Sequence, residues 1–417
     1  MSSLPVPPTA LPAPRTLIVD DGRLFTVDQT RLPFEHVRLE LRDAADCAHA
    51  IASMQVRGAP LIGAVAGFGL ALALREQADD EALHRAVERL AATRPTAVNL
   101  RWALERVRAA VAGLPAEHRA ADAWREAVAI ADEDVAINQA IGEHGAALLR
   151  GLVQRRADAG RPVSAEAPLQ VLTHCNAGRL ATVAHGTALA PVYALAAEGV
   201  PLHVWVDETR PRNQGASLTA WELAEAGVPC TVIADNAGGQ LMREGRVDGV
   251  IVGCDRVAAN GDVANKVGTY LKALAARDAG VPFWVACPTP TIDASIADGT
   301  AIPIECRDPR EVTHLTGRAA DGTMVEVQLV PDGVSALNPA FDVTPARLVD
   351  ALITELGVLD PREAGGARGP RSAVEGSRTT VDGRSGPAAS AAVGSSRGLW
   401  LAGAALAAAW LAWARLR

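Results

Sequence analysis

The second half of the chain alternates short apolar runs with helical segments, and this alternation constrains the fold more than any other feature of the sequence. Between residues 169 and 287 the apolar runs are LQVLTHC, PLHVWVD, PCTVIAD, VDGVIVGCD and VPFWVAC. The helical segments between them include ATVAHGTALAPVYALAAEG, LTAWELAEAG and KVGTYLKALAARDAG. This rhythm is typical of a parallel sheet with helices on both faces. We therefore expect an α/β domain over residues 165–360.

Polar residues follow these strands at the point where each strand ends. They occupy residues 173–176, 207–210, 235–236 and 254–256. Ligands of open parallel sheets collect at the carboxyl ends of the strands. The sequence therefore predicts a functional site on this rim of the sheet.

The first part of the chain has a different pattern. Residues 16–43 carry short alternating apolar runs broken at Asp21-Gly22 and Leu32-Pro33, which predicts a small hairpin or meander. From about residue 44 to residue 150, Ala, Leu, Glu and Arg dominate and apolar residues recur at helical spacing. We expect a mainly helical N-terminal domain over residues 15–150 with a small β hairpin.

The C-terminal segment changes composition again. Residues 362–397 are rich in Gly, Ser, Arg, Ala and Pro without apolar periodicity, which predicts a disordered linker within a tail at 362–417. An apolar stretch follows at 399–414. As a helix it would span about 24 Å, short of the roughly 30 Å hydrocarbon core. A packing tail or an extension without function is favoured, with a membrane anchor as the alternative.

Charge and cysteine usage narrow the function classes. A formal charge of -8 and the lack of a Lys/Arg-rich run argue against a nucleic-acid partner. The six cysteines are scattered, no C-x-x-C pair occurs, and no secretory signal opens the chain, so we expect reduced thiols in the cytoplasm. The histidines form no metal-binding pattern and no G-x-G-x-x-G follows a strand. We assign no metal and no cofactor.

The segment THCNAG at 173–178 places Cys175 at the end of a buried strand and before a loop that leads into a helix. Oriented backbone N–H groups at such a position lower a thiol pKa, which predicts a reactive cysteine. The alternative is a buried, inert cysteine, which is the interpretation we give to the other five.

Two segments of the helical half offer polar candidates for a site. Arg57 and Gly58 precede a strongly apolar helix whose N-terminus could cradle a phosphate, although taken alone a Gly/Pro turn that caps a buried helix is the favoured interpretation. Arg94 and Asn99 lie in RPTAVNL, which also reads as an ordinary N-cap with Pro ahead of it.

The densest polar stretch of the second half is GCDRVAANGDVANK at 253–266. Turn chemistry explains Asn260-Gly261 but not Asp255, which is still attached to the strand VIVGC. Polar residues beside a buried strand are costly unless each has a partner or a ligand. Gln214, in the loop after DETRP, is placed where it would face the same rim.

Together these segments resemble the 5-methylthioribose-1-phosphate isomerases, a family of the methionine salvage pathway. The resemblance runs from about residue 15 through RGAP, RPTAVNL, THCNAG, DETRP, the Asp255 stretch, PTPTID and IPIECRDPREVT to about residue 358. It implies a mainly helical N-terminal domain and a Rossmann-like C-terminal domain, paired as a homodimer. The implied activity is an aldose–ketose isomerisation that needs no cofactor.

The resemblance also implies roles for individual residues. Cys175 would assist proton transfer or stabilise the transition state. Asp255 would donate a proton, provided that apolar surroundings keep its carboxyl protonated. The residues implied to bind the sugar phosphate are Arg57, Gly58, Ala59, Arg94, Gln214, Asn265 and Lys266. Whether hydrogen moves as a proton or as a hydride stays open.

Two other functions share this fold. Ribose-1,5-bisphosphate isomerases use the same reacting pair, and regulatory subunits of the translation-initiation guanine-exchange factor are not catalytic. The chain also departs from the family pattern at Ser217, Cys254, Thr289 and Cys306. None of these departures removes a reacting group.

Overall fold

The structure is a computed structural model that describes residues 14–367. It confirms the predicted α/β sheet, which has seven strands in the order β16-β15-β10-β7-β4-β5-β6. All neighbouring pairs are parallel except β15 with β16. The strands are β4 Leu169–Thr173, β5 Leu202–Asp207, β6 Cys230–Ile233, β7 Gly249–Val252, β10 Phe283–Ala286, β15 Ala351–Thr354 and β16 Gly357–Leu359.

Alternating side chains of the sheet bury against two different helix layers. Ile251 and Trp284 point into a core shared with α5 and with α6 (Ala190–Ala197), whereas Val250, Val252 and Phe283 point into the opposite core. That second core is closed by α8 (Ala237–Arg243) and α9 (Thr269–Ala279). Both faces of the central strands are therefore covered, which is why β7 and β10 are buried and apolar along their whole length.

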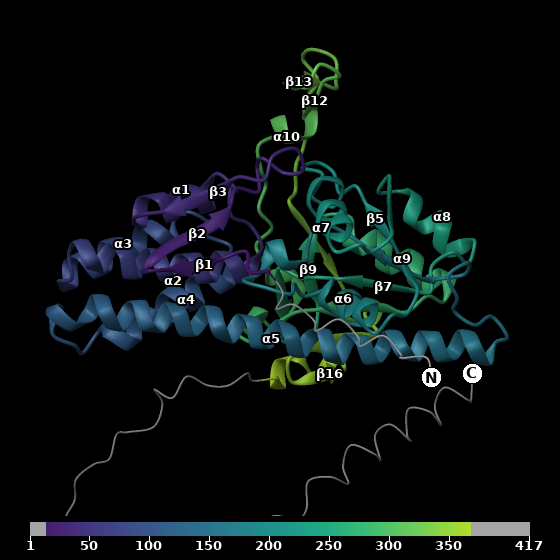
Figure 1. The fold of residues 1–417 in the computed structure, drawn as a ribbon, viewed down its shortest axis with the longest axis horizontal. Coiled ribbons are helices and arrows are strands. Elements are labelled where there is room, and N and C mark those ends of the chain that lie inside the picture. The colour runs from purple at the N-terminus through teal and green to yellow at the C-terminus, as the bar shows by residue number, and fades with distance from the viewer. Residues whose placement is uncertain (1–13, 368–417) are drawn as a thin grey trace, which may run out of the picture. The chain divides into compact units, whose positions relative to one another are not determined.

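The N-terminal part is mainly helical, as predicted, with a small antiparallel sheet (Figure 1). The helices are α1 Ala44–Ala52, α2 Ala59–Glu76, α3 Asp80–Ala91, α4 Val98–Val111 and α5 Ala116–Asp158. The sheet is a three-stranded meander of β1 Ile18–Asp20, β2 Arg23–Val27 and β3 Arg38–Leu41. Asp21 and Gly22 join the first two strands with φ values of 47° and 71°, the two left-handed positions that a tight hairpin turn requires.

Helix α5 is 43 residues long and contributes to two cores. Ala123, Ala127 and Ile130 pack in the N-terminal helical core, whereas Ile141 and Leu149 pack under the parallel sheet. These buried positions recur every three to four residues, so one stripe of the helix faces both cores. The boundary predicted near residue 150 falls inside this helix.

Smaller elements complete the C-terminal part. They are α7 Ala220–Glu225, α10 Arg310–Thr313, β8 Arg256–Ala258, β9 Val263–Lys266, β11 Ile292–Asp293, β14 Phe341–Thr344, and the hairpin strands β12 His314–Arg318 and β13 Met324–Gln328. Strands β11, β8, β9 and β14 form a four-stranded sheet. In Figure 1 the hairpin stands away from the parallel sheet.

Two sequence expectations need correction. The segment at 181–199, expected to be helical throughout, is α-helical only over Ala190–Ala197. Residues 182–189 form an irregular loop, and Thr182 and Thr187 of this loop line the cavity described below. The predicted linker was to begin at residue 362, but Pro361–Gly366 forms a 3₁₀ helix with Ala364 fully buried. The rest of the predicted linker and the apolar stretch at 399–414 lie outside the described residues.

Among the described helices, only α2 is long and apolar enough to cross a membrane. In the folded chain 72% of its apolar window is buried inside the protein. Residues such as Leu61, Val65 and Phe68 are fully buried in the N-terminal core. Its apolar composition is therefore explained by its position in the core of the N-terminal part.

Candidate active site

A cavity lies where the N-terminal helices meet the rim of the parallel sheet. All nine residues implied by the resemblance line it, and they are Arg57, Gly58, Ala59, Arg94, Cys175, Gln214, Asp255, Asn265 and Lys266. They come from segments far apart in the chain, including the start of α2, the loops after β4 and β7, and the end of β9. The structure thus brings together every predicted site residue. Asn99 is buried but does not line the cavity.

The N-terminus of α2 opens into this cavity. Gly58 is the N-cap, with φ at 94° and no side-chain cap, and Ala59 begins the helix. A side chain at Gly58 would overlap Ala181, so glycine is required for this close approach. Free N–H groups and the positive end of a helix dipole favour an anion. Arg57, directly before this cap, also lines the cavity with its guanidinium.

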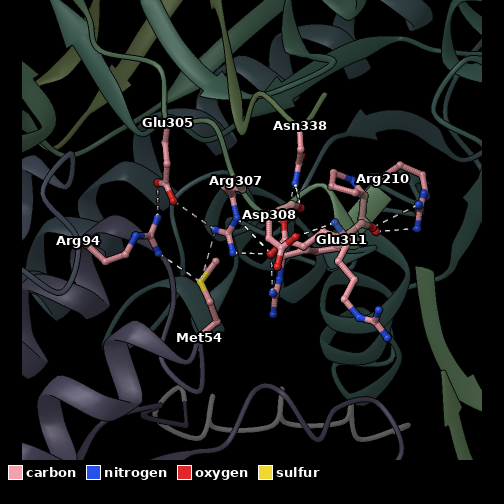
Figure 2. A network of polar contacts seen from close by, with 11 residues as sticks. Met54, Arg94, Arg210, Glu305, Arg307, Asp308, Glu311 and Asn338 are labelled. Atoms are coloured by element: carbon pink, nitrogen blue, oxygen red, sulfur yellow. Dashed lines mark hydrogen bonds and ion pairs between the residues drawn. The ribbon is translucent and has the colours of Figure 1, made fainter. Parts of the chain in front are cut away.

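Arg94 is a further cation that lines the cavity. Its guanidinium is 3.4 Å from Glu305 and 3.2 Å from the sulfur of Met54 (Figure 2). Arg307 pairs with Glu311 at 2.7 Å, lies 3.9 Å from Glu305 and also lines the cavity. Burial lowers the pKa of Arg94, and Glu305 opposes that shift. Arg307 is a cavity residue that the sequence did not single out.

Cys175 sits in a strained loop rather than at a helix N-terminus. Its φ is 65°, an uncommon value for a residue other than glycine. Its N–H donates to Thr209 Oγ1 at 2.8 Å, and its carbonyl accepts from Thr219 Oγ1 at 2.6 Å. The expectation of a lowered thiol pKa was wrong, because burial raises the pKa of Cys175 and Arg57 and Lys266 only oppose that shift.

Asp255 follows β7 and its backbone N–H donates to Ala264 O at 2.9 Å. Burial raises the pKa of Asp255, with Lys266, Arg57 and Arg94 acting in the opposite direction. This direction agrees with a carboxyl that retains its proton. Burial in turn lowers the pKa of Lys266, whose Nζ donates to Ala340 O at 2.8 Å.

Two buried polar atoms of cavity residues have no hydrogen-bond partner within residues 14–367. They are Oε1 of Gln214 and Nε of Arg94. An unpaired buried polar atom costs about 1–3 kcal/mol. A polar ligand in the cavity would supply the missing partners. Asn265 differs, since its Nδ2 already donates to Thr269 Oγ1 at 3.0 Å.

His174, Asp207 and Asp235 come close enough together to be considered as metal ligands. The imidazole of His174 contacts Asp207 Oδ2 at 2.8 Å and Val267 O at 2.9 Å. Lys272 Nζ lies 3.2 Å from the same carboxylate oxygen and donates to the carbonyl of Asp235. This ammonium already supplies the positive charge that the buried carboxylate requires.

The four departures from the family pattern lie in different surroundings. The hydroxyl of Ser217 donates to Asn213 O at 2.7 Å and that of Thr289 donates to Glu355, so neither projects into the cavity. Cys306 is exposed. Cys254 does line the cavity, and its thiol contacts Cys287 in the neighbouring strand end.

Comparison with known proteins places these residues in context. Residues 55–361 match the initiation factor 2 subunit family. The chain is 57% identical to a methylthioribose-1-phosphate isomerase of Rhodospirillum rubrum over 347 residues, which are 83% of this chain and 88% of that protein. It is 58% identical to the isomerase of the same name from Acidiphilium cryptum, over 84% of this chain and 94% of that protein.

Solved structures give a similar result. The 5-methylthioribose 1-phosphate isomerase from Pyrococcus horikoshii aligns with a TM-score of 0.71 at 40% identity, covering 86% of this chain and 95% of that one. A protein of A. fulgidus described as the delta subunit of translation initiation factor eIF-2B aligns with a TM-score of 0.68 at 41% identity, covering 83% of this chain and 96% of that one.

Proposed function

The chain belongs to the initiation factor 2 subunit family and, within it, to the methylthioribose-1-phosphate isomerases, and from this membership we propose that it converts 5-methylthioribose 1-phosphate to 5-methylthioribulose 1-phosphate in methionine salvage. The observation that carries the proposal is the meeting of Cys175 and Asp255 with Arg57, Arg94 and Lys266 in one cavity.

The phosphate would lie at the N-terminus of α2. The helix cap at Gly58 and the cations of Arg57, Arg94 and Lys266 line the same cavity. A phosphate there gains charge-assisted hydrogen bonds while the helix dipole favours its negative charge. The acidic chain as a whole would otherwise repel a dianion.

The sugar is a ring locked by its anomeric phosphate, so ring opening needs an acid. In our proposal Asp255 delivers its proton to the ring oxygen as the bond from C1 to that oxygen breaks. The raised pKa of Asp255 supports this role. After the transfer its carboxylate accepts the proton of the C2 hydroxyl, which restores the acid.

Cys175 would move the remaining hydrogen. Its sulfur takes the proton from C2 to leave an enol phosphate, and the thiol returns that proton to C1 of the ketose. Burial raises the pKa of the free thiol. Arg57 and Lys266 oppose this shift by charge, which reduces the cost of forming the thiolate without removing it.

A turnover assay of the purified chain tests the proposal and its two rivals together. The substrates are 5-methylthioribose 1-phosphate and ribose 1,5-bisphosphate, and the product is followed as the ketose phosphate. We expect turnover of the first substrate and a kcat/KM at least tenfold lower with the second. Preference for the bisphosphate would support the first rival, and no turnover of either would support a regulatory protein such as the A. fulgidus match.

We also propose that the enzyme is a cytoplasmic homodimer. All six cysteines are free in the structure, which fits a reducing compartment. Val325, Val327 and Leu329 alternate along one face of the projecting hairpin and are each at least 40% exposed, which fits a surface covered by a second copy. Analytical ultracentrifugation tests the dimer, and a monomeric mass at micromolar concentration would contradict it.

A further inference from the structure

Glu222 is a buried carboxylate that contacts the loop after β4, which carries Cys175, but does not itself line the cavity. It lies on α7, it is 0% exposed, and its Oε2 accepts from the N–H of Arg179 at 2.8 Å. Its Oε1 accepts from Nδ2 of Asn176, the residue after Cys175. A buried carboxylate is costly unless several donors satisfy it. Burial raises its pKa to about 6.

Asn176 connects this carboxylate to Arg57. The Arg57 Nη1 donates to Asn176 Oδ1, and Nη2 donates to the Asn176 carbonyl at 2.7 Å. Asn176 is only 2% exposed. Because Nδ2 must donate to Glu222 and Oδ1 must accept from Arg57, the orientation of the amide is fixed by its two neighbours.

The backbone at Gly178 passes very close to the Glu222 carboxylate. A side chain at Gly178 would overlap the carboxylate oxygens directly, and one at Gly186 would overlap Gly178. The loop therefore passes over Glu222 at a distance that only glycine permits. Such close packing holds the carboxylate, and through it Asn176, in one place.

We propose that Glu222 is a positioning residue that fixes the guanidinium of Arg57 at the phosphate end of the cavity through the amide of Asn176. The amide separates the two charges. The relay acts through geometry, because the two oxygen atoms of Asn176 hold the guanidinium of Arg57 in one orientation. The inference rests on the proposed function, in which Arg57 binds the phosphate of the sugar.

Exchange of donors and acceptors tests the relay. In Glu222→Gln the new amide can accept from only one of Arg179 and Asn176, so we expect KM for 5-methylthioribose 1-phosphate to rise about tenfold or more. Asn176→Asp places two carboxylates together and should be worse. In the double variant the amide of residue 222 donates to the carboxylate of residue 176, which still accepts from Arg57, so KM should return toward the wild-type value.

The control is Glu225→Gln on the same helix. Its carboxylate pairs with Arg179 but is 48% exposed, and we expect wild-type KM. A role in stability alone would lower Tm in Glu222→Gln without changing KM, and that result would overturn the proposal. If Glu222→Gln does not fold, the double variant decides, since an elevated KM there would also overturn it.

Binding of inorganic phosphate, measured as a shift in Tm of the full chain, separates this inference from the proposed function. Weaker phosphate binding in Glu222→Gln with recovery in the double variant supports the relay even if the wild type does not isomerise the sugar phosphate. Equal phosphate binding in wild type and Glu222→Gln would overturn it. A wild-type chain that binds no phosphate would overturn it as well, because there would be no phosphate site to organise.

Discussion

The backbone N–H of Cys175 donates to Oγ1 of Thr209 at 2.8 Å, and both residues have left-handed φ values, 65° and 67°. A β-branched residue in this region is strained by about 1–3 kcal/mol. Asp235 holds Thr209 there by accepting from its N–H at 2.7 Å. The strained pair fixes the loop that carries the thiol.

Thr209→Val keeps the shape of the side chain but removes the acceptor for the Cys175 N–H. We expect a loss of about 1–3 kcal/mol in the free energy of unfolding, because a buried N–H is left unpaired. The loop should also become less ordered, with a fall in kcat. Thr209→Ser keeps the hydroxyl and should retain both values. Urea unfolding and steady-state kinetics measure the effects, and wild-type behaviour of the valine variant would contradict the argument.

Cys175→Ser and Asp255→Asn should each lower kcat by about 10² to 10⁴ while substrate binding changes little. A serine hydroxyl is a far weaker base than a thiol, and an asparagine amide cannot deliver a proton to the ring oxygen. The two losses should not multiply, because both residues act on one transition state. Cys230→Ser, on β6 and outside the cavity, serves as the control. Wild-type turnover in either single variant would refute the assigned role.

Arg94→Ala should mainly raise KM, by on the order of a hundredfold if a charge-assisted interaction of about 3 kcal/mol is lost. Arg94 has 14% of its side chain exposed and points into the cavity beside Glu305. Arg108→Ala, which removes an exposed arginine of α4, is the matched control. An unchanged KM in Arg94→Ala would remove that residue from the phosphate site.

Asp134 should make stability depend on pH. Burial raises its pKa to about 7 from the ordinary 3.8, and its Oδ2 accepts from the Val183 N–H at 2.7 Å. Between these pH values the folded state keeps the proton that the unfolded chain releases. The free energy of unfolding therefore falls as pH rises from about 4 to 7, by on the order of 4 kcal/mol, and changes no further above that range.

Asp134→Asn lacks this titration. The stability of the variant relative to wild type should rise from pH 4 to pH 7 and then stay level, as measured by urea unfolding at a series of pH values. Asp132→Asn changes an exposed carboxylate of the same helix and should follow the wild-type curve apart from its ion pair with Arg15. Parallel curves for Asp134→Asn and wild type would show that Asp134 does not titrate in this range.

The packed part of the chain extends past residue 362, where the composition predicted that a disordered linker begins. Ala364 packs in a core of the sheet and the N–H of Gly365 donates to Ala259 O at 3.0 Å. Removing residues 368–417 should leave stability and kcat unchanged, whereas removing 360–417 should cost about 1–3 kcal/mol through lost burial and hydrogen bonds. Equal stability of the two truncations would contradict this limit. Cosedimentation with lipid vesicles, lost on removal of 368–417, would support the membrane alternative.

The fold and the site were predictable to different extents. Strand ends could be predicted because apolar runs stop at polar residues, and this placed Cys175 and Asp255 on one rim. The thiol pKa of Cys175 could not be predicted, because its burial comes from loops distant in sequence. Arg307 and Glu222 were missed since nothing local distinguishes them, and Glu222 meets Asn176 only through the folding of α7 against the rim.

Helix α5 is a single continuous helix of 43 residues, about 65 Å long. It is embedded in both hydrophobic cores, and no proline interrupts it between Ala116 and Asp158. A hinge between the two cores would have to break its hydrogen-bond ladder and expose apolar surface at each end. The continuous helix therefore joins the two cores, and we expect entry of the sugar phosphate to depend on the loops that border the cavity, such as the segment that carries Arg307.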